Sequence, residues 1–252
     1  MEIGIEVKHI YDWSKGRYGS PRIAKELQMQ GKEVSQGFVA RIMKAKNLKS
    51  VRIRRFKQTT NSKHIYPIVD NKLNQNFRVE QSNQAWVSDI TYIKTLEGWT
   101  YLTTVIDLFD RKVIGWHMSD NMRASDTVIP ALNKACAGIL RYPNQELVFH
   151  SDRGMQYACN EFKKALEYQK GMIQSMSGKG NCYDNAVAES FFKTIKSELI
   201  YQNRYQTRKQ AYLSVFEYIE GFYNTNRRHT HLGNLTLKEV YKQKKFKQQK
   251  VA

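Results

Sequence analysis

The chain has 252 residues, of which 41 are Lys or Arg and 23 are Asp or Glu, so its formal net charge at pH 7 is +18. Hydrophobic residues make up 41% and aromatic residues 12%, which excludes disordered and collagen-like chains and provides enough apolar material for a packed core. The sequence contains no apolar run of about 18 residues and no signal-peptide pattern, and its three cysteines form neither an even set nor a close pair. We therefore expect a cytoplasmic protein with reduced thiols and no membrane segment.

Positive charge gathers at the two ends of the chain. Residues 1–58 carry 14 basic and 5 acidic side chains, and residues 196–252 carry 12 basic and 4 acidic ones. Residues 59–195 are almost neutral, with 15 basic and 14 acidic side chains. Because Lys and Arg bind a polyanion by displacing its counterions, this segregation favours a nucleic-acid partner over a cationic surface that serves only solubility.

Two short helices separated by a glycine turn are predicted near the N-terminus. Ser20 can cap the first helix and Gly31 can end it, and Ser35 can cap the second helix, which runs to about residue 46. The second helix is expected to bury four apolar side chains and to expose four polar or basic ones: Phe38, Val39, Ile42 and Met43 against Gln36, Arg41, Lys44 and Lys46. This pattern is typical of a helix-turn-helix that contacts DNA through Arg41 and Lys44, although helical hairpins without a nucleic-acid function share it.

A basic linker and then an α/β domain are predicted next. Residues 51–78 show no sustained periodicity and are rich in Thr, Asn, Ser and Lys, which is typical of a linker. Aromatic and β-branched residues then indicate three antiparallel strands with short connections, at 86–93, 99–107 and 112–117. A helix, a strand, a helix, a short strand and a long helix follow, at 124–140, 146–150, 160–169, 172–174 and from 184 to beyond 196.

Three carboxylates stand where they can converge beside this sheet. Asp89 lies among apolar residues of the first strand, where an unpaired charge is costly, Asp152 follows the fourth strand, and Glu189 lies on the last helix. Carboxylate oxygens without His or Cys partners suit Mg²⁺ or Mn²⁺, and two such ions can act on the attacking and leaving oxygens of a phosphodiester. The pattern therefore indicates phosphoryl-transfer chemistry.

Each carboxylate also has a structural interpretation. Asp89 can pair with a Lys or Arg, Asp152 can stabilise its own turn, and Glu189 can pair with Lys193 one helical turn away. One shared site explains all three positions at once, whereas the structural interpretation needs three separate reasons. Three other acids are interpreted separately. Asp107 and Asp110 lie at the end of the second strand and are rival candidates for the site, with Asp107 as a candidate auxiliary residue. Asp184 is expected to be the N-cap of the last helix.

Motifs in a fixed order carry a family resemblance across nearly the whole chain. The core motifs are WVSDITY (86–92), IDLFDR (106–111), HSDRG (150–154), SMS (175–177), GNCYDNA (180–186) and ESFF (189–192). With them the sequence resembles the OrfB transposases of IS3-family insertion sequences, whose core is similar to that of retroviral integrases. The segments at both ends match the same family: RYG (17–19) before the two predicted helices, and YN (223–224), RRH (227–229) and LG (232–233) near the C-terminus.

The resemblance implies an RNase H-like fold, with a mixed five-stranded sheet and flanking helices. It implies four segments: a helix-turn-helix DNA-binding domain at 1–55, a basic linker at 56–80, a catalytic core at 81–200 and a basic helical C-terminal extension at 201–252. It also implies a DDE site of Asp89, Asp152 and Glu189 that binds two Mg²⁺ or Mn²⁺ ions, nicks DNA at the element's ends and transfers the resulting 3′-hydroxyl. Thirty-six residues separate Asp152 from Glu189, one more than is usual in the family.

Further side chains are expected to contact the DNA. Asn185 and Lys193 lie one helical turn before and after Glu189, Arg153 follows Asp152, and a basic cluster lies near the C-terminus. The full set of expected DNA-binding residues is Arg41, Lys44, Arg153, Asn185, Lys193, Arg227 and Arg228. The aromatic pair at 191–192 is expected in the core and not stacked on bases.

The expected partners follow from the same resemblance. They are double-stranded DNA (terminal inverted repeats and target), further copies of the chain on that DNA, and a DNA-binding protein from an upstream reading frame, fused or associated. The expected location is the bacterial nucleoid. Two other functions stay open: a nuclease or resolvase that hydrolyses without joining, and a DNA-binding regulator with a degenerate core.

Overall fold

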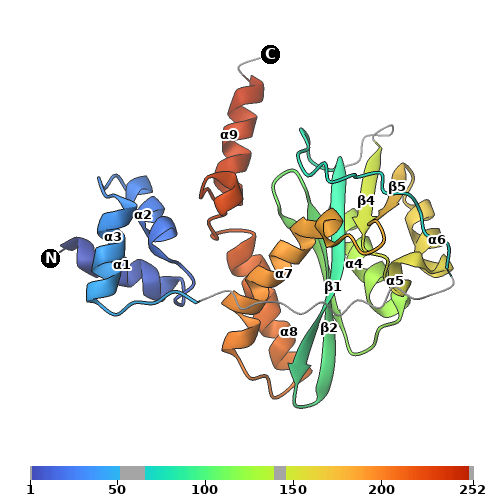
Figure 1. Ribbon diagram of the computed structural model, residues 1–252, viewed down its shortest axis with the longest axis horizontal. Coiled ribbons are helices and arrows are strands. Elements are labelled where there is room, and N and C mark those ends of the chain that lie inside the picture. The colour runs from blue at the N-terminus through green and yellow to red at the C-terminus, as the bar shows by residue number, and fades with distance from the viewer. Residues whose placement is uncertain (1, 52–65, 139–145, 250–252) are drawn as a thin grey trace. The chain divides into compact units, whose positions relative to one another are not determined.

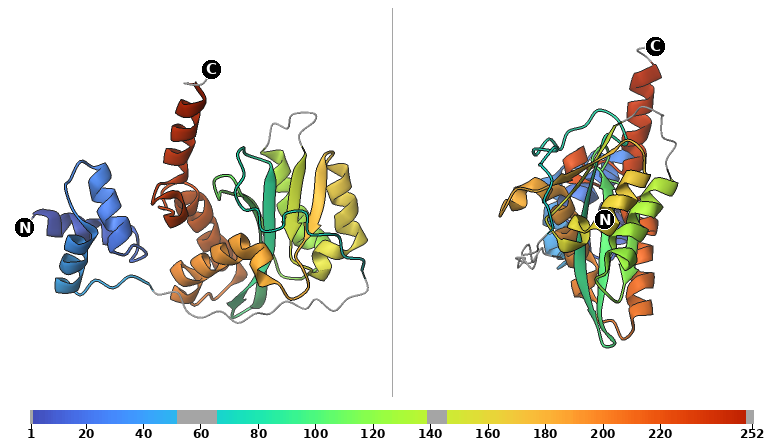
Figure 2. Two further views of the ribbon diagram at one scale, coloured as in Figure 1. Left: turned by 45° about the horizontal axis from the view of Figure 1, so that its top comes forward. Right: turned by 90° about the vertical axis from the view of Figure 1, so that its right-hand side faces the viewer.

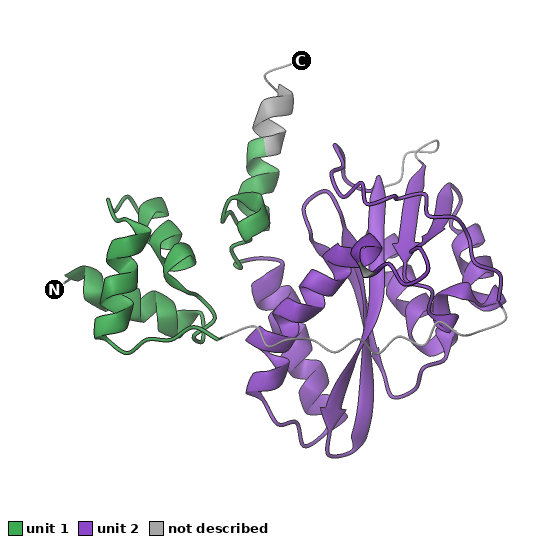
Figure 3. Cartoon of the chain, in the orientation of Figure 1, with its two compact units in different colours: residues 1–54, 226–252 green, residues 55–225 purple. Residues whose placement is uncertain are grey.

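The chain forms two compact units. The structure, a computed structural model, describes residues 2–51, 66–138 and 146–249 (Figure 1). Unit 1 consists of residues 1–54 and 226–252, and unit 2 consists of residues 55–225 (Figure 3). Unit 2 is thus inserted in the chain between the two segments of unit 1. The four-segment division expected from the sequence stays a prediction, and residues 201–225 of the expected extension belong to unit 2.

Unit 1 combines N-terminal and C-terminal helices. Its described elements are α1 (Glu2–Trp13), α2 (Ser20–Met29), α3 (Gln36–Ala45), the short 3₁₀-helix η5 (Thr230–Leu232) and α9 (Leu237–Gln249). Ser35 caps α3 as predicted, because its hydroxyl accepts a hydrogen bond from the N–H of Phe38 at 3.1 Å. The predicted Ser20 cap is wrong, since α2 begins at Ser20 itself and Gly19 stands at the cap position without a side-chain hydrogen bond.

The burial of α3 differs from the prediction at one position. Val39 and Met43 are buried as expected and Ile42 is half-buried, but the Phe38 side chain is 40% exposed. Three short helices bury only a narrow stripe of each helix, so the first turn of α3 keeps an aromatic ring at the surface. α1 was not predicted, and it contributes Val7 and Ile10 to the same small core.

Unit 2 is built on a five-stranded sheet in the order β3-β2-β1-β4-β5 (Figure 1). The strands are β1 (Ala85–Thr95), β2 (Gly98–Asp107), β3 (Val113–Ser119), β4 (Leu147–Ser151) and β5 (Met172–Met176). β1, β2 and β3 form the predicted antiparallel meander, whereas β4 pairs in parallel with β1 and β5 in parallel with β4. The predicted mixed sheet is therefore confirmed.

Helices lie on both faces of this sheet (Figure 2). The helical elements of unit 2 are η1 (Ala124–Asp126), α4 (Val128–Ala137), α5 (Met155–Ala158), α6 (Asn160–Tyr168), η2 (Cys182–Asn185), α7 (Ala186–Glu198), η3 (Ile200–Gln202), α8 (Arg208–Phe216) and the π-helix η4 (Glu217–Tyr223). An apolar cluster that includes Trp86, Phe149 and Phe162 joins the sheet to α4, α5 and α6. α7 contacts β1 and buries Phe191 and Phe192, as expected from the sequence.

One glycine sets the distance between a helix and the sheet. A Cβ at Gly115 of β3 would lie 2.4 Å from the carbonyl oxygen of Ala131 in α4. Only glycine fits at so close an approach of two backbones. Residues 139–140, the predicted end of this helix, lie outside the described residues.

The described part of the expected linker packs against unit 2. Leu73 is buried, and the N–H groups of Lys72 and Leu73 donate hydrogen bonds to Ser175 Oγ on β5 at 2.9 and 3.1 Å. The guanidinium of Arg111 donates to the carbonyl of Phe77 at 2.9 Å. Residues 56–65 of the expected linker lie outside the described residues. Residues 66–78 therefore act as an edge of unit 2, held mainly through backbone groups.

Candidate active site

The strand register brings two of the predicted acids side by side. Ser88 of β1 pairs with Ser151, the last residue of β4, in a parallel ladder, so Asp89 in β1 and Asp152 directly after β4 follow a paired position and lie near each other. Glu189 lies in the first turn of α7, the helix that contacts β1. The structure thus places the three carboxylates in one region of unit 2.

The pKa of Asp89 depends on its burial and on the charges around it. Burial raises the pKa of its carboxyl well above the ordinary value, and the negative charge of Asp152 and, less strongly, that of Glu189 raise this pKa further. The N–H of Ile90, which donates to Asp89 Oδ1 at 2.7 Å, and the charge of Lys196 act in the opposite direction. Asp89 therefore lies close enough to Asp152 and Glu189 for their charges to affect its protonation.

Two of the acids also make the local contacts that a structural role predicts. Asp152 Oδ1 accepts a hydrogen bond from the N–H of Gly154 at 2.9 Å. Glu189 Oε2 lies 3.6 Å from Lys193 Nζ, and the two side chains are 28% and 45% exposed. Within the described ranges, no group of three or more His, Cys, Asp or Glu side chains is already arranged to hold a metal ion. Glu189 is thus partly exposed and pairs with a lysine that is itself partly exposed.

A buried hydrogen-bond network fixes the turn that carries Asp152. Ser175 Oγ accepts from two backbone N–H groups, so its own proton goes to His150 Nδ1 at 2.8 Å. The ring proton of His150 then lies on Nε2 and faces Ser177 Oγ at 3.2 Å, and Ser177 donates to a β4 carbonyl at 3.3 Å. Every proton in this chain of bonds has an acceptor while His150 is neutral. Burial lowers the pKa of His150 to about 4, in agreement with a neutral ring.

The amide of Asn185 ties the start of α7 to β1. Asn185 Nδ2 donates to the carbonyl of Ser88 at 3.0 Å, and the residue is only 4% exposed, so it is not at the surface where a DNA contact was expected. Its Oδ1 is buried and has no hydrogen-bond partner among the described residues. The Ser88 hydroxyl forms a hydrogen bond with Tyr157 Oη at 2.7 Å. Asn185 therefore positions the helix of Glu189 against the strand of Asp89.

The rival acids at the end of β2 have structural partners. Asp107, which is 1% exposed, accepts hydrogen bonds from the Ser82 hydroxyl at 2.6 Å and from the N–H groups of Asn83 and Phe109 at 3.0 Å. Burial raises the pKa of Asp107, and these bonds oppose the shift. Asp110 Oδ1 accepts from the N–H of Lys112 at 2.9 Å. Both acids organise the turn between β2 and β3.

The expected cap of α7 is wrong. The helix begins at Ala186 with Asn185 at the cap position, and Asp184 folds back onto the preceding loop. There it accepts from the N–H of Gly178 at 2.6 Å and from the side-chain amides of Gln75 and Asn181, both at 2.8 Å. Burial raises the pKa of Asp184, but its hydrogen bonds outweigh burial and the pKa lies below the ordinary value. Asp184 thus holds the loop that leads into the helix of Glu189.

Lys196 is a candidate site residue that the sequence analysis missed. It is 8% exposed and lies on α7, seven residues after Glu189, a spacing that places both on one side of the helix. Burial lowers the pKa of its ammonium group to about 8, and the charge of Asp89 opposes the shift. A lysine at this spacing from a predicted catalytic acid was the available signal.

The expected DNA-binding residues differ in exposure. Arg41 and Lys44 are exposed on α3, and the Arg41 guanidinium carbon lies 5.8 Å from the centre of the exposed Phe38 ring. In unit 2, Arg153 is half-buried and its Nε donates to the carbonyl of Ser177 at 2.6 Å.

The basic cluster near the C-terminus is not a surface cluster. Arg227 and Arg228 are 5% and 3% exposed. Arg228 forms ion pairs with Glu26 and Glu239 inside unit 1. Its placement differs from the expected DNA contact because two carboxylates already surround its guanidinium.

Known families match along most of the chain. An HTH-like domain matches residues 2–56, and integrase core domains match residues 79–182 and 170–236. An insertion element IS600 uncharacterized 31 kDa protein of Shigella sonnei is 39% identical over 238 residues, which cover 94% of this chain and 85% of that protein. Transposase InsF for insertion sequence IS3A of Escherichia coli (strain K12) is 40% identical over 223 residues, 88% of this chain and 76% of that protein. The chain belongs to the IS3 family of transposases.

The family and the fold agree. A transposase for insertion sequence element IS904 of Lactococcus lactis is 38% identical over 94% of this chain and 92% of that protein. A chain of the simian T-cell lymphotropic virus intasome matches 92% of this chain and 72% of its own length with a TM-score of 0.51 at 17% identity, so the retroviral-integrase-like fold is confirmed. The protein is a DDE transposase that acts in DNA transposition, and its integrase core depends on divalent metal ions. None of the described helices of the transposase is long and apolar enough to cross a membrane.

Proposed function

We propose that Asp89, Asp152 and Glu189 are the DDE residues of this transposase and that they bind two Mg²⁺ ions, for which Mn²⁺ can substitute. The observation that carries the proposal is the pairing of Ser88 with Ser151, which sets Asp89 of β1 beside Asp152 after β4, next to the helix of Glu189. The raised pKa of Asp89, caused by burial and by the charges of Asp152 and Glu189, agrees with this arrangement. A donor set of carboxylate oxygens suits a hard divalent cation. The Oδ1 of Asn185, which has no hydrogen-bond partner among the described residues, is a further oxygen close to β1. These residues fit the metal, because bound cations would remove the repulsion among them.

Glu189 is the acid that has to change position. Its contact with Lys193 is a partly exposed ion pair between neighbouring helical turns, which contributes little stability. Glu189 can therefore exchange Lys193 for a metal ion at small cost. Asp89 on a central strand and Asp152 in its hydrogen-bonded turn are held in place beforehand. The exchange leaves the Lys193 ammonium available for a DNA phosphate.

The reaction consists of two phosphoryl transfers. When bound at these residues, Mg²⁺ would lower the pKa of the attacking water or 3′-hydroxyl and would stabilise the negative charge that grows on the phosphate oxygens. In the first transfer, water attacks the phosphodiester at the element's end and the 3′-oxygen leaves as a hydroxyl. In the second, that hydroxyl attacks a target phosphodiester and a second 3′-oxygen leaves. Lys196 provides a fixed cation near Asp89 for the phosphate.

Recognition of the terminal repeats is assigned to α3. Arg41 and Lys44 stand on its exposed face, and a helix-turn-helix places its second helix in the major groove. Arg153 and Lys193 are proposed phosphate contacts near the reacting strand. Two DNA ends meet at one target, so the working complex contains at least two copies of the chain. A fused or associated upstream-frame protein and a location at the bacterial nucleoid belong to the same proposal.

The test uses the full chain, Mg²⁺ and a labelled duplex that carries the terminal repeat. Nicked and joined products are expected, and Asp152→Asn should abolish both, because an amide is a poorer metal ligand than a carboxylate. Asp120→Asn is the matched control, since Asp120 is an exposed acid just after β3. Unchanged products from Asp152→Asn would contradict the assignment. A duplex that already has a 3′-hydroxyl end separates a transposase, which joins it to target DNA, from a nuclease, which leaves it unjoined.

A further inference from the structure

Two family motifs from opposite ends of the chain meet inside unit 1. Tyr18, from the RYG motif, is fully buried, and its hydroxyl donates to the carbonyl of Asn226 at 3.0 Å. The same hydroxyl accepts from the N–H of Arg228, from the RRH motif, at 2.8 Å. These partners lie 208 and 210 positions further along the chain. A tyrosine hydroxyl has one proton to donate and also accepts, so this contact uses both functions of the group.

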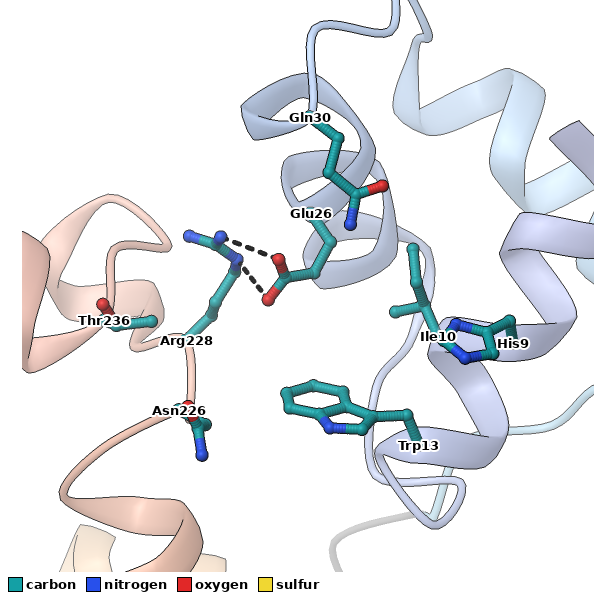
Figure 4. A pocket seen from close by; sticks show the side chains of 8 residues that line it. All are labelled: His9, Ile10, Trp13, Glu26, Gln30, Asn226, Arg228 and Thr236. Atoms are coloured by element: carbon teal, nitrogen blue, oxygen red, sulfur yellow. Dashed lines mark hydrogen bonds and ion pairs between the residues drawn. The ribbon is translucent and has the colours of Figure 1, made fainter.

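The side chain of Arg228 also joins the N-terminal and C-terminal segments of unit 1, at a contact that we call the junction. Its guanidinium contacts both carboxylate oxygens of Glu26 on α2 at 2.9 Å (Figure 4). Its Nη1 donates to Glu239 of α9 and to the carbonyl of Asn234, both at 3.0 Å. Glu239 in turn accepts from the N–H of Thr236 at 2.7 Å. The Arg228 side chain is 3% exposed, and those of Glu26 and Glu239 are 18% and 26% exposed. The buried guanidinium is therefore compensated only while both half-buried carboxylates are present.

A cavity lies along this junction. It has a volume of about 340 Å³ and is lined by residues of α1, α2 and the C-terminal segment: His9, Ile10, Trp13, Glu26, Gln30, Asn226, Arg228 and Thr236 (Figure 4). Apolar packing across the junction is therefore incomplete. The directional contacts of Tyr18 and Arg228 carry a correspondingly larger share of the attachment, and single polar changes should loosen it.

We propose that residues 226–239 form a C-terminal latch on which DNA binding by the helix-turn-helix depends. The proposal rests on the proposed recognition of DNA by α3. The latch holds α2 through Glu26 and the start of α2 through Tyr18, and α2 packs directly against α3. Arg228 thus supports DNA affinity by fixing α2 and makes no contact with DNA itself. Because the latch follows unit 2 in the chain, the DNA-binding unit is complete only after the catalytic unit has been made.

The substitution Glu26→Gln in the full chain distinguishes the latch from a direct DNA contact. If Arg228 touched phosphates, removal of a competing negative charge would leave DNA affinity unchanged or increase it. The latch predicts the opposite: about tenfold weaker binding to a terminal-repeat duplex and about tenfold faster amide hydrogen exchange, the size expected for one lost charged hydrogen bond. The faster exchange should occur together in α2 and in residues 226–236, while the amides of β1 and β4 keep their rates. Unchanged or tighter DNA binding, or faster exchange confined to 226–236, would overturn the latch.

Three variants complete the experiment. Glu33→Gln removes an exposed acid of unit 1 outside the latch and should change neither measurement. Tyr18→Phe removes only the hydroxyl and should reproduce the faster exchange of Glu26→Gln without a change of charge; normal exchange would overturn the latch. Lys44→Ala should weaken DNA binding with normal exchange. If Lys44→Ala bound normally, recognition by α3 would fail, while the exchange data on Glu26→Gln and Tyr18→Phe would still decide whether the latch exists.

Discussion

The two units of the transposase use charge in opposite ways. In unit 2, the functional candidates Asp89 and Lys196 both have shifted pKa values. They lie in a unit that is held together by a hydrogen-bonded sheet and an apolar cluster. In unit 1, the functional candidates Arg41 and Lys44 are exposed, and the buried Arg228 is structural. In unit 1, a basic residue is therefore a candidate DNA contact only where the fold leaves its charge exposed, because the buried Arg228 is already paired with carboxylates. Substitutions in unit 2 should therefore change the chemistry, and substitutions in unit 1 should change DNA affinity.

The largest expected effect is that of Asp152→Asn on catalysis. Loss of one charged metal ligand should lower the rate of strand nicking by about a thousandfold, because electrostatic stabilisation of the transition state is the main catalytic contribution here. DNA affinity should stay within about twofold, since a carboxylate does not bind phosphates. Nicking rates and fluorescence anisotropy on the same terminal-repeat duplex measure both quantities. A large loss of DNA affinity in this variant would show that Asp152 of unit 2 contributes to DNA binding as well as to catalysis.

Acid should destabilise unit 2 through His150. Its pKa is lowered from 6.5 to about 4 in the folded chain, so between these values the unfolded state binds more protons and stability falls as the pH falls. The expected loss is about 3 kcal/mol between pH 6.5 and pH 4, from about 1.4 kcal/mol for each unit of pKa shift. Chemical denaturation of the original chain and of His150→Asn at several pH values in EDTA measures this contribution as the difference between their two slopes, because the other titrating groups are common to both proteins.

Unit 1 should respond to acid at a lower pH. Burial raises the pKa of Glu239, but the N–H of Thr236 and the charge of Arg228 outweigh it and lower the pKa below the ordinary 4.5. A carboxylate with a lowered pKa contributes stability above its unfolded value and loses it as the pH falls through the folded value. Amide exchange at pH 5 should therefore accelerate in β4 and β5 before it does in α2. Simultaneous acceleration would show that the two units do not unfold separately.

A smaller effect is expected at Lys196. Because its pKa lies at about 8, the ammonium loses its proton just above neutral pH, and kcat/KM for nicking should decline as the pH rises through 8. Lys196→Met should remove this alkaline decline and lower activity at pH 7 by about tenfold, a typical loss for one electrostatic contact in a transition state. Lys164→Met is the matched control, since Lys164 is an exposed lysine of α6 outside the proposed site. A decline that persists in Lys196→Met has to come from another group.

The sequence predicted the parts of the structure that depend on local patterns. Alternating β-branched and aromatic residues predicted the strands, and the charge of Asp89 in an apolar strand marked the region of the candidate site. α1 was missed because only Val7 and Ile10 are buried on it, a stripe too narrow to recognise. The roles of Asp184 and Arg228 depend on Gln75 and Glu26, which are 109 and 202 positions away. Such pairings follow from the tertiary fold and leave no local signal.

The smallest expected effect concerns single phosphate contacts of unit 1. Each lysine that neutralises one phosphate releases counterions, so Lys44→Ala should lower the slope of log affinity against log salt concentration by about 1. The loss of affinity should be similar for the terminal repeat and for unrelated DNA, whereas Arg41→Ala should weaken the terminal repeat more if Arg41 reads a base edge. Anisotropy titrations at several salt concentrations with both duplexes make this distinction. An unchanged slope in both variants would remove α3 from the DNA interface, and the exposed cations of unit 1 would then lose their assigned role.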